Sequence, residues 1–254
     1  KRQAEILPIK AWRYNQSLSQ NIESLTSPLF DVVSDKQRNK LYENEFNSIH
    51  LSVPKGENAA LNAASILKKW KASGIISQDQ LPGIYVYYQY FTLSGGHKEL
   101  CRKGFICNIK AYDWNEKQIF RHENTIPKSV NDRIDLLEKT KLNVSPTHGL
   151  YTDANHELEA YMDEAILNPV FVTEDYQGVK DVLAIIDEPE IVKYFIDLIA
   201  DKKIILADGH HRYEGSLEYR KSCMKANKNH TGFEAYNYHM MYFTNTNGNH
   251  LKIL

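Results

Sequence analysis

The sequence predicts an α/β or α+β fold in which a mixed sheet is flanked by helices. Segments that alternate as strands do are separated along the chain by segments of helical periodicity, an order typical of layered α/β architectures. The run Tyr85–Phe91 alternates in this way, and we interpret its tyrosines as core and cross-strand packing. The apolar residues Ile204–Leu206, followed by Asp-Gly and a helical pattern, predict a buried strand that opens directly into a helix.

Each element is predicted from its own local pattern. The segment 58–73 has apolar residues at helical spacing, and Gly74 follows it where a C-cap is expected. Ser129 is the expected N-cap of the helix that runs to Leu142. The Gly-Gly pair after Ser94 predicts a hairpin turn. The predicted helices span 34–42, 58–73, 129–142, 162–167, 188–200 and 212–226, and the predicted strands span 7–14, 84–93, 103–110, 117–120, 182–186, 203–207 and 239–244.

The length of 254 residues suits one large domain or two small ones. We expect an N-terminal α/β region over residues 1–100, with a helix and a hairpin strand, and a phosphate-binding region over residues 101–254. Near the end, Asn247-Gly248 predicts a tight turn and 251–254 the returning strand. Because the sequence stops inside this apolar run, we expect the second region to be truncated at its C-terminus.

Composition excludes several classes of protein. The net charge of −1 argues against nucleic acid as a partner. No apolar stretch approaches the roughly 20 residues that span a bilayer, so no membrane association is predicted. The cysteines, Cys101, Cys107 and Cys223, lack CxxC spacing, which disfavours a disulfide framework or a zinc site and favours a reducing cytoplasm. These features do not define an oligomeric state.

The octapeptide Ala207–Glu214 carries the strongest functional signal. A strand that ends in Asp-Gly and opens into a helix brings several backbone N–H groups to one point, and these groups favour anions. Arginine can hold a phosphate through two parallel hydrogen bonds. The octapeptide therefore predicts a small-molecule phosphate or nucleotide site, formed by Asp208, Gly209, His210, His211 and Arg212.

The common nucleotide and hydrolase motifs do not occur. The sequence lacks G-x-x-x-x-G-K-[ST], G-x-G-x-x-G and G-x-S-x-G. On a helix, His210 and His211 would point about 100° apart, which disfavours a shared metal ion, and we predict no metal ligand. Either histidine could instead be an ordinary surface or packed residue.

A second polar group lies upstream, in His122-Glu123-Asn124-Thr125 and in Asp132-Arg133. From its spacing alone this group could be a solvated face. A carboxylate beside a phosphate site could also accept the proton of an alcohol during phosphoryl transfer. Gly215, inside the predicted helix, would be explained by the close approach of another backbone or a ligand, or by simple tolerance.

The segment Asp208–Arg212 resembles the D-G-H-H-R box of the ParB/sulfiredoxin-like superfamily, whose helix N-terminus binds nucleotide phosphates. His122-Glu123, followed by a helix with Arg133, resembles the H-E segment of the ADP-dependent free serine kinases in that superfamily. The resemblance implies a ParB/sulfiredoxin-like nucleotide-binding core over residues 101–254. It further implies catalytic roles for Glu123, the base, and for His122, Asp208 and His210; phosphate binding by Gly209, His211 and Arg212; and support from Thr125, Asp132, Arg133 and Glu214.

Nearly the whole chain resembles a bacterial and archaeal domain-of-unknown-function family with an ADGHHRYE box. The resemblance implies a role in serine biosynthesis in place of phosphoserine phosphatase. The chain departs from the compact serine kinases in its first 90 residues and in an apparent insert over 144–179, which separates Glu123 from Asp208. The motifs that carry the resemblance are Trp12-Arg13-Tyr14, Asp31-Val32-Val33-Ser34, Asn47-Ser48-Ile49-His50-Leu51, Tyr85-Val86-Tyr87, His122-Glu123-Asn124-Thr125, Asp132-Arg133 and Ala207–Glu214.

Together these features predict a cytoplasmic phosphotransferase or phosphatase that acts between serine and phosphoserine, with Mg²⁺ and ADP or AMP as helpers. The alternative is a ParB-like nucleotide-binding protein that regulates or associates with DNA without catalysis. A basic stripe is expected of such a protein, and the sequence has no run of lysines and arginines. A third alternative is a structural protein that keeps the remnants of a phosphate pocket.

Overall fold

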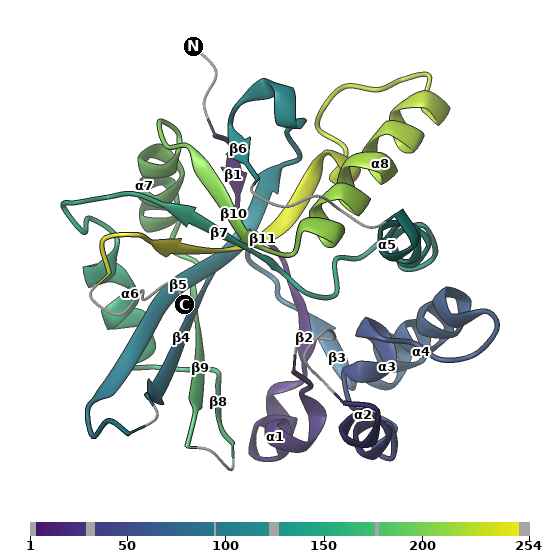
Figure 1. The fold of residues 1–254 in the computed structure, drawn as a ribbon, viewed down its shortest axis with the longest axis horizontal. Helices are drawn as coiled ribbons and strands as arrows, with labels where there is room; N and C mark the ends of the chain where they lie inside the picture. Colours follow the sequence, from purple (N-terminus) through teal and green to yellow (C-terminus); the bar gives the residue numbers. More distant parts are fainter. Residues whose placement is uncertain (1–3, 29–33, 94, 122–126, 176–177, 249–254) are drawn as a thin grey trace.

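A large mixed sheet organises the part of the chain that the computed structural model describes, residues 4–28, 34–93, 95–121, 127–175 and 178–248 (Figure 1). Nine strands in these ranges form it in the order β6-β10-β7-β11-β5-β4-β9-β8, with β1 paired to β5. The β6–β10 and β7–β11 pairs are parallel and the others are antiparallel. The strands are β1 (Ile6–Leu7), β4 (Ile84–Thr92), β5 (Glu99–Lys110), β6 (Ile119–Phe120), β7 (Thr147–Tyr151), β8 (Phe171–Glu174), β9 (Lys180–Ile186), β10 (Ile204–Asp208) and β11 (Tyr238–Asn245), and a separate pair joins β2 (Trp12–Tyr14) to β3 (Ile76–Gln78).

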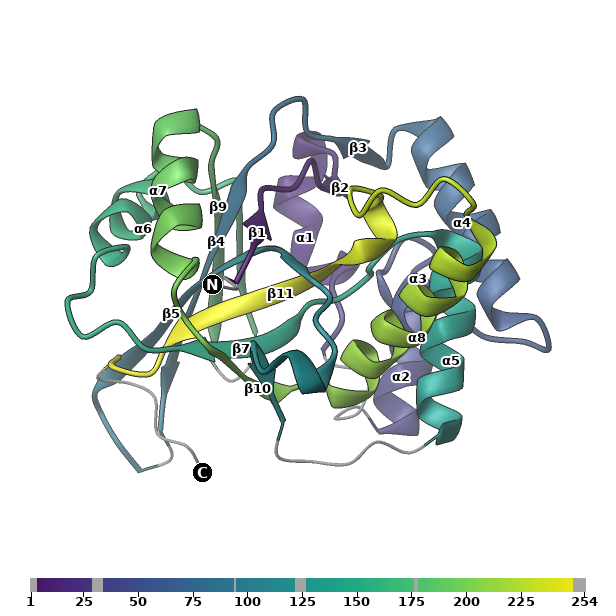
Figure 2. The ribbon, with the colours of Figure 1, turned by 90° about the horizontal axis from the view of Figure 1, so that it is seen from above.

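The helices gather in two groups at opposite ends of the molecule (Figures 1 and 2). One group holds α6 and α7, and the other holds α2 to α5 with α8. None of the helices within the described ranges has both the length and the apolar run that crossing a bilayer requires. The helices are α1 (Ile22–Leu25), α2 (Asp35–Tyr42), α3 (Ile49–Ser52), α4 (Ala59–Ser73), α5 (Pro127–Thr140), α6 (Glu159–Ile166), α7 (Pro189–Ile199) and α8 (His210–Ala226), with short 3₁₀ turns at Gln16–Asn21, Trp114–Glu116 and Ala235–Asn237.

The main core lies on one face of the sheet. Phe105 of β5 stacks on Phe243 of β11 and meets Phe195 of α7 edge-on, with ring centroids 5.2 and 5.0 Å apart. Tyr213 and Leu217 of α8 are buried in the same core. Helix α8 is thus fixed to the sheet by apolar packing, which positions its N-terminus against the end of β10.

Most predicted elements are confirmed. Helices α2 and α4 match their predicted ranges, and Gly74 ends α4 in the left-handed conformation. Strands β4 and β5 form the predicted hairpin, although β5 begins earlier, at Glu99. Strands β9, β10 and β11 and helix α7 also lie where they were predicted. The prediction of a mixed sheet with flanking helices is therefore correct.

Two helix starts were predicted wrongly. Helix α5 begins at Pro127, so Ser129 lies inside the helix and is not its N-cap. Proline suits the first turn of a helix because its fixed φ is already helical and its missing N–H needs no partner there. Helix α8 begins at His210, two residues before the predicted start, because Gly209 takes the left-handed N-cap conformation.

The segment taken as an insert contains a central strand. Strand β7 lies between β10 and β11 and pairs with both. Its sequence, Thr-His-Gly-Leu-Tyr, has two polar residues and a glycine, so its hydrophobic pattern is weak. The residues 144–179 are therefore partly integral to the sheet that carries the octapeptide.

Two further predictions concern the boundary between the regions 1–100 and 101–254 and the strand expected at the end of the second region. The boundary at residue 100 falls at the start of β5, a strand of the main sheet. The predicted returning strand, 251–254, lies outside the described residues.

Candidate functional site

The junction between β10 and α8 requires a glycine. Gly209 has a φ of 89°, a conformation that side chains disfavour. A Cβ at this position would lie 2.6 Å from Cγ2 of Thr147 and 3.0 Å from Nη2 of Arg212. The glycine thus lets β7, the Arg212 side chain and the first turn of α8 come together.

Asp208 and Arg212 face each other across this junction. The backbone N–H of Gly209 donates to Oδ1 of Asp208 over 2.8 Å, and Nη2 of Arg212 lies 3.6 Å from Oδ2. Nη1 of Arg212 donates to the carbonyl of Pro146 over 2.5 Å and to Oγ of Ser145 over 3.4 Å. Arg212 is 7% exposed, whereas the Asp208 side chain is 46% exposed. The result is a buried, anchored guanidinium beside an open carboxylate.

The two histidines of the octapeptide differ in burial. His210 is 3% exposed and His211 is half-buried. Nε2 of His211 is shielded from solvent and forms no hydrogen bond with any of the described residues. A shielded imidazole nitrogen without a protein partner in the described part of the chain is suited to a ligand oxygen.

Tyr213 and Glu214 fix the helix to its surroundings. The Tyr213 hydroxyl donates to the carbonyl of Tyr112 over 2.5 Å. Nε1 of Trp114 donates to Oε2 of Glu214 over 2.8 Å, and the Arg121 guanidinium lies 4.8 Å from the Trp114 ring. Glu214 therefore ties α8 to the turn that carries Trp114, and its predicted supporting role in the site stays a prediction.

Helix α5 brings a second arginine to α8. Gly215 lets the helices touch, because a Cβ there would lie 3.0 Å from Cβ of Arg133. Nη1 of Arg133 donates to the carbonyl of Ser52 over 2.9 Å. Burial and the nearby charge of Arg212 lower the pKa of Arg133, and Asp132 opposes this. A cavity of about 30 Å³ between α5 and α8 has both arginines in its wall, and it has room for water but not for a nucleotide.

A buried hydrogen-bond network that was not predicted from the sequence lies on the core side of the junction. The ring of His239, on β11, bonds through Nε2 to Oγ1 of Thr147 over 2.7 Å and through Nδ1 to Oγ of Ser216 over 2.6 Å. Burial, followed by the charge of Arg212, lowers the pKa of His239 to about 3. The neutral ring thus ties β11, β7 and α8 together directly beneath Gly209, and we refer to Thr147, Ser216 and His239 as the His239 network.

His148 on β7 is a second histidine that the sequence analysis overlooked. It lies opposite Asp208 in the sheet, and its Nε2 bonds to Oγ1 of Thr244 over 2.7 Å. Burial and the charge of Arg102 lower the pKa of His148 to about 4, and Asp208 opposes them. The only signal in β7 was the adjacent polar pair Thr147-His148, and Gly149 beside it left the strand without a clear alternation.

The structure leaves part of the predicted site untested. His122, Glu123 and Thr125 lie outside the described residues. Strand β6 before them runs parallel to β10, with Phe120 opposite Ile205, so the chain leaves both strands at the same edge of the sheet. Asp132 is exposed on α5.

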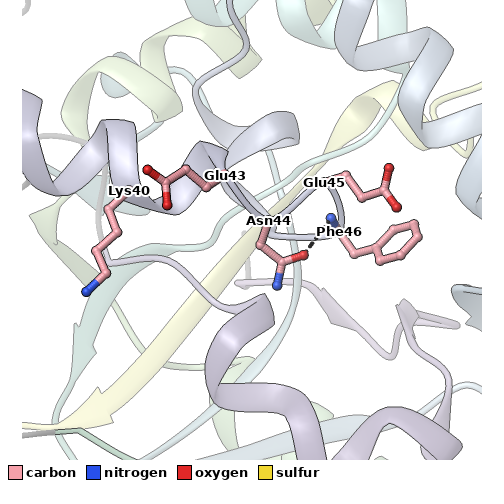
Figure 3. Close-up of a pocket in the computed structure, with 5 residues that line it drawn as sticks. All are labelled: Lys40, Glu43, Asn44, Glu45 and Phe46. Carbon is pink, nitrogen blue, oxygen red and sulfur yellow. Dashed lines mark hydrogen bonds between the residues drawn. The ribbon is translucent and has the colours of Figure 1, made fainter.

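A second hollow lies on the surface at the end of α2 (Figure 3). Its side chains diverge: Lys40 and Glu45 point away from each other in the figure. Oδ1 of Asn44 accepts a hydrogen bond from the backbone N–H of Phe46 over 3.0 Å, and its Nδ2 donates to the carbonyl of Ser24. These groups stabilise a turn, and none of the lining residues belongs to the octapeptide.

A metal centre built from protein side chains is not seen in the described ranges, where no three His, Cys, Asp or Glu residues are grouped to hold an ion. The site instead offers cations, backbone N–H groups and one open carboxylate. Cations and backbone N–H groups at a helix N-terminus are groups that favour anions.

Comparison with known proteins places this sequence in a family. Residues 6–254 match the model described as "Protein of unknown function (DUF1015)". The chain belongs to the DUF1015 family. Neither the curated proteins nor the solved structures gave a match. The predicted membership of a domain-of-unknown-function family is confirmed, and for this DUF1015 protein the relationship to the ParB/sulfiredoxin-like superfamily stays a prediction.

Proposed function

We propose that this protein moves a phosphoryl group onto or off the serine hydroxyl, with an adenine nucleotide as the donor or acceptor, or with water as the acceptor when phosphoserine is hydrolysed. The observation that carries the proposal is the junction itself, where the buried guanidinium of Arg212 meets the N-terminus of a 17-residue helix. Helix N-termini and arginine both favour phosphate. Arg133 adds a second, half-buried cation in the wall of the small cavity that Arg212 also lines.

The proposal assigns a role to each group at the junction. Arg212 and the first N–H groups of α8 hold the phosphoryl oxygens, and His210 and His211 offset the charge that develops on them. Asp208 is open and could hold Mg²⁺, an ion that proteins bind through one or two carboxylates together with substrate phosphates. When bound, Mg²⁺ neutralises phosphate charge and polarises the phosphoryl group.

Glu123 is the proposed base on the serine hydroxyl. The support is topological: β6 and β10 are parallel neighbours in register, and Glu123 follows Phe120 by three residues as Asp208 follows Ile205. Carboxyl ends of parallel strands meet at one edge of a sheet, where ligands of α/β proteins commonly bind. A base in hydrogen-bond reach of the hydroxyl contributes about 10²–10⁴-fold to such a step.

The test is serine release from phosphoserine, measured with the purified protein alone, with ADP and with AMP. We expect Glu123→Gln to lower turnover about 100-fold or more while the dissociation constant of phosphoserine changes little. The matched control is Glu138→Gln, the same change on the exposed side of α5. Absence of serine release under all three conditions contradicts the proposal, and nucleotide binding without turnover would favour the non-catalytic ParB-like alternative.

A further inference from the structure

The cavity between α5 and α8 is bordered by two arginines from elements far apart in the sequence. The two helices lie side by side in both views (Figures 1 and 2). Arg133 comes from α5 and Arg212 from α8, and the segment 142–145, which leads into β7, completes the wall. Neither Asp208 nor Gly209 is among the described residues of this wall. The cavity is therefore separate from the open edge of the junction.

The wall combines positive charge with hydrogen-bond donors and apolar side chains. Its apolar part includes two leucines of α5, and no Asp or Glu is found among its described residues. Oγ of Ser145 accepts a hydrogen bond from Nη1 of Arg212 over 3.4 Å, so the hydroxyl proton of Ser145 can go to another acceptor. The amide of Asn143 adds two N–H donors to the wall. Such a wall suits an acceptor that carries negative charge.

The two guanidinium groups are held near each other by helix packing. Gly215 lets α5 approach α8, because a Cβ there would lie 3.0 Å from Cβ of Arg133. Nη1 of Arg133 donates to the carbonyl of Ser52 over 2.9 Å, a neutral oxygen that orients the guanidinium without balancing its charge. After burial, the charge of Arg212 is the next largest cause that lowers the pKa of Arg133. The two cations thus repel each other, and an anion between them would reduce that repulsion.

The size of the cavity determines which anion fits. Its volume is about 30 Å³, and a water molecule needs about 10–15 Å³, so the cavity has room for about two water-sized atoms. A phosphate or sulfate ion, with its oxygens arranged around a central atom, is too large for this space. A chloride ion is only slightly larger than a water molecule. The cavity therefore favours a single-atom anion over an oxyanion.

We propose that the cavity between α5 and α8 binds one chloride ion between Arg133 and Arg212. The ion accepts hydrogen bonds from the two guanidinium groups and from the hydroxyl of Ser145, and it offsets the repulsion between the two cations. Charge-assisted hydrogen bonds of this kind are about twice as strong as neutral ones. The bound ion joins α5 to α8 and steadies Arg212 beside the junction. This chloride site goes beyond the proposed function and does not depend on phosphoryl transfer.

The test measures the thermal unfolding midpoint in sodium chloride and in sodium gluconate at equal sodium concentration, without phosphate. Gluconate is too large for the cavity and controls for ionic strength. Once chloride exceeds its dissociation constant tenfold, the midpoint should be about 3–6 °C higher than in gluconate. Arg133→Gln removes the charge, keeps an N–H group for the carbonyl of Ser52 and should lose most of this rise. The matched control Arg220→Gln changes an arginine of α8 that bonds Asn237 and should keep the rise.

Bromide locates the ion directly, because it replaces chloride in such sites and scatters X-rays anomalously. Crystals of the wild type grown in bromide should show an anomalous peak between the guanidinium groups of Arg133 and Arg212. Equal midpoints in chloride and gluconate, an undiminished rise in Arg133→Gln, or a cavity without a bromide peak would overturn the proposal. The crystal measurement needs no variant, so it decides the question if Arg133→Gln does not fold. Serine release is measured separately, so failure of either proposal leaves the other standing.

Discussion

Two polar clusters flank the Asp208–Arg212 junction on opposite faces of the sheet. The His239 network lies on the core side, where both ring nitrogens of His239 are bonded to hydroxyl groups. On the other side, Asp208, His148 and Tyr242 lie opposite one another on β10, β7 and β11. Arg102 is on the same face further along β5, four residues before Ile106, the residue opposite Tyr242. We call these four residues, Asp208, His148, Tyr242 and Arg102, the Arg102 row. There the carboxylate is open and the guanidinium lacks an acceptor among the described residues.

This difference distinguishes residues that hold the strands and helices in place from residues that are available to bind a ligand. A polar group that is buried and fully hydrogen-bonded stabilises one arrangement of its elements, and its loss leaves partners unsatisfied. A polar group that is shielded but lacks a partner costs stability unless a ligand completes it. We therefore expect variants of the His239 network to change mainly the free energy of unfolding, and variants of the Arg102 row to change mainly ligand affinity.

The largest effect on stability is expected from His239→Leu. The substitution leaves the buried hydroxyls of Thr147 and Ser216 without their partner, and each unsatisfied group costs about 1–3 kcal/mol. Urea denaturation should show a free energy of unfolding lower by about 3–4 kcal/mol. His148→Leu, which removes one hydrogen bond and a ring contact from the half-buried row, should cost about 1–2 kcal/mol. Equal losses would remove the distinction between the two clusters.

Gly209→Ala comes next and probes the junction between the clusters. A left-handed φ costs a residue with a side chain about 1–3 kcal/mol, and the added methyl would lie 2.6 Å from Cγ2 of Thr147. We expect a loss of about 2–3 kcal/mol in unfolding free energy. Thr147→Ser removes that methyl and keeps the hydroxyl that bonds His239, so the double variant should be more stable than the sum of the single changes predicts. Strict additivity would show that φ strain alone is responsible.

Two histidines should make stability depend on pH, because burial lowers the folded pKa of His148 to about 4 and adds a loss at pH 5 of similar size to that from His239. The variant test uses His239. Its pKa is about 3 in the folded protein and about 6.5 when unfolded, so only the unfolded chain gains this proton between those values. Stability is complete above pH 6.5 and falls as the pH falls towards 3. At pH 5 the loss is about 2 kcal/mol, from 1.36 kcal/mol per pKa unit. Unfolding free energies at pH 7 and pH 5 should differ by about that much less in His239→Leu, and an unchanged difference would assign the effect to other groups.

Most strands and helices could be predicted from the sequence, because each of them has a clear pattern in its own residues. The hairpin of β4 and β5, the amphipathic α4 and the strand-to-helix step at Gly209 each carry their own signal. Strand β7 does not, because its identity depends on pairing with β10 and β11, which lie far away in sequence. Tertiary pairing of this kind overrides weak local propensity.

The candidate site likewise contains residues that a local motif predicts and residues that only the tertiary fold brings together. Asp208, Gly209 and Arg212 are adjacent in sequence, and their shared role could be predicted from one motif. Thr147 and His239 converge only through the pairing of β7 with β11, strands that lie far apart in the sequence. Glu123 lies outside the described residues, so the part of the site that would carry the chemistry rests on the resemblance and on the alignment of β6 with β10.

The smallest expected effect is that of Tyr242→Phe, which tests whether the aromatic surface of the Arg102 row is preformed. The variant loses the hydrogen bond from the hydroxyl to the carbonyl of Tyr87, 3.1 Å long, and keeps the ring that stacks on His148. A single hydrogen bond of this kind contributes about 1 kcal/mol, so the free energy of unfolding should fall by that amount in urea denaturation. Because the ring still covers Gly104, phosphoserine affinity should stay within about twofold of the wild type, a difference of about 0.4 kcal/mol. A large loss of affinity without a loss of stability would instead place the Tyr242 hydroxyl on the ligand.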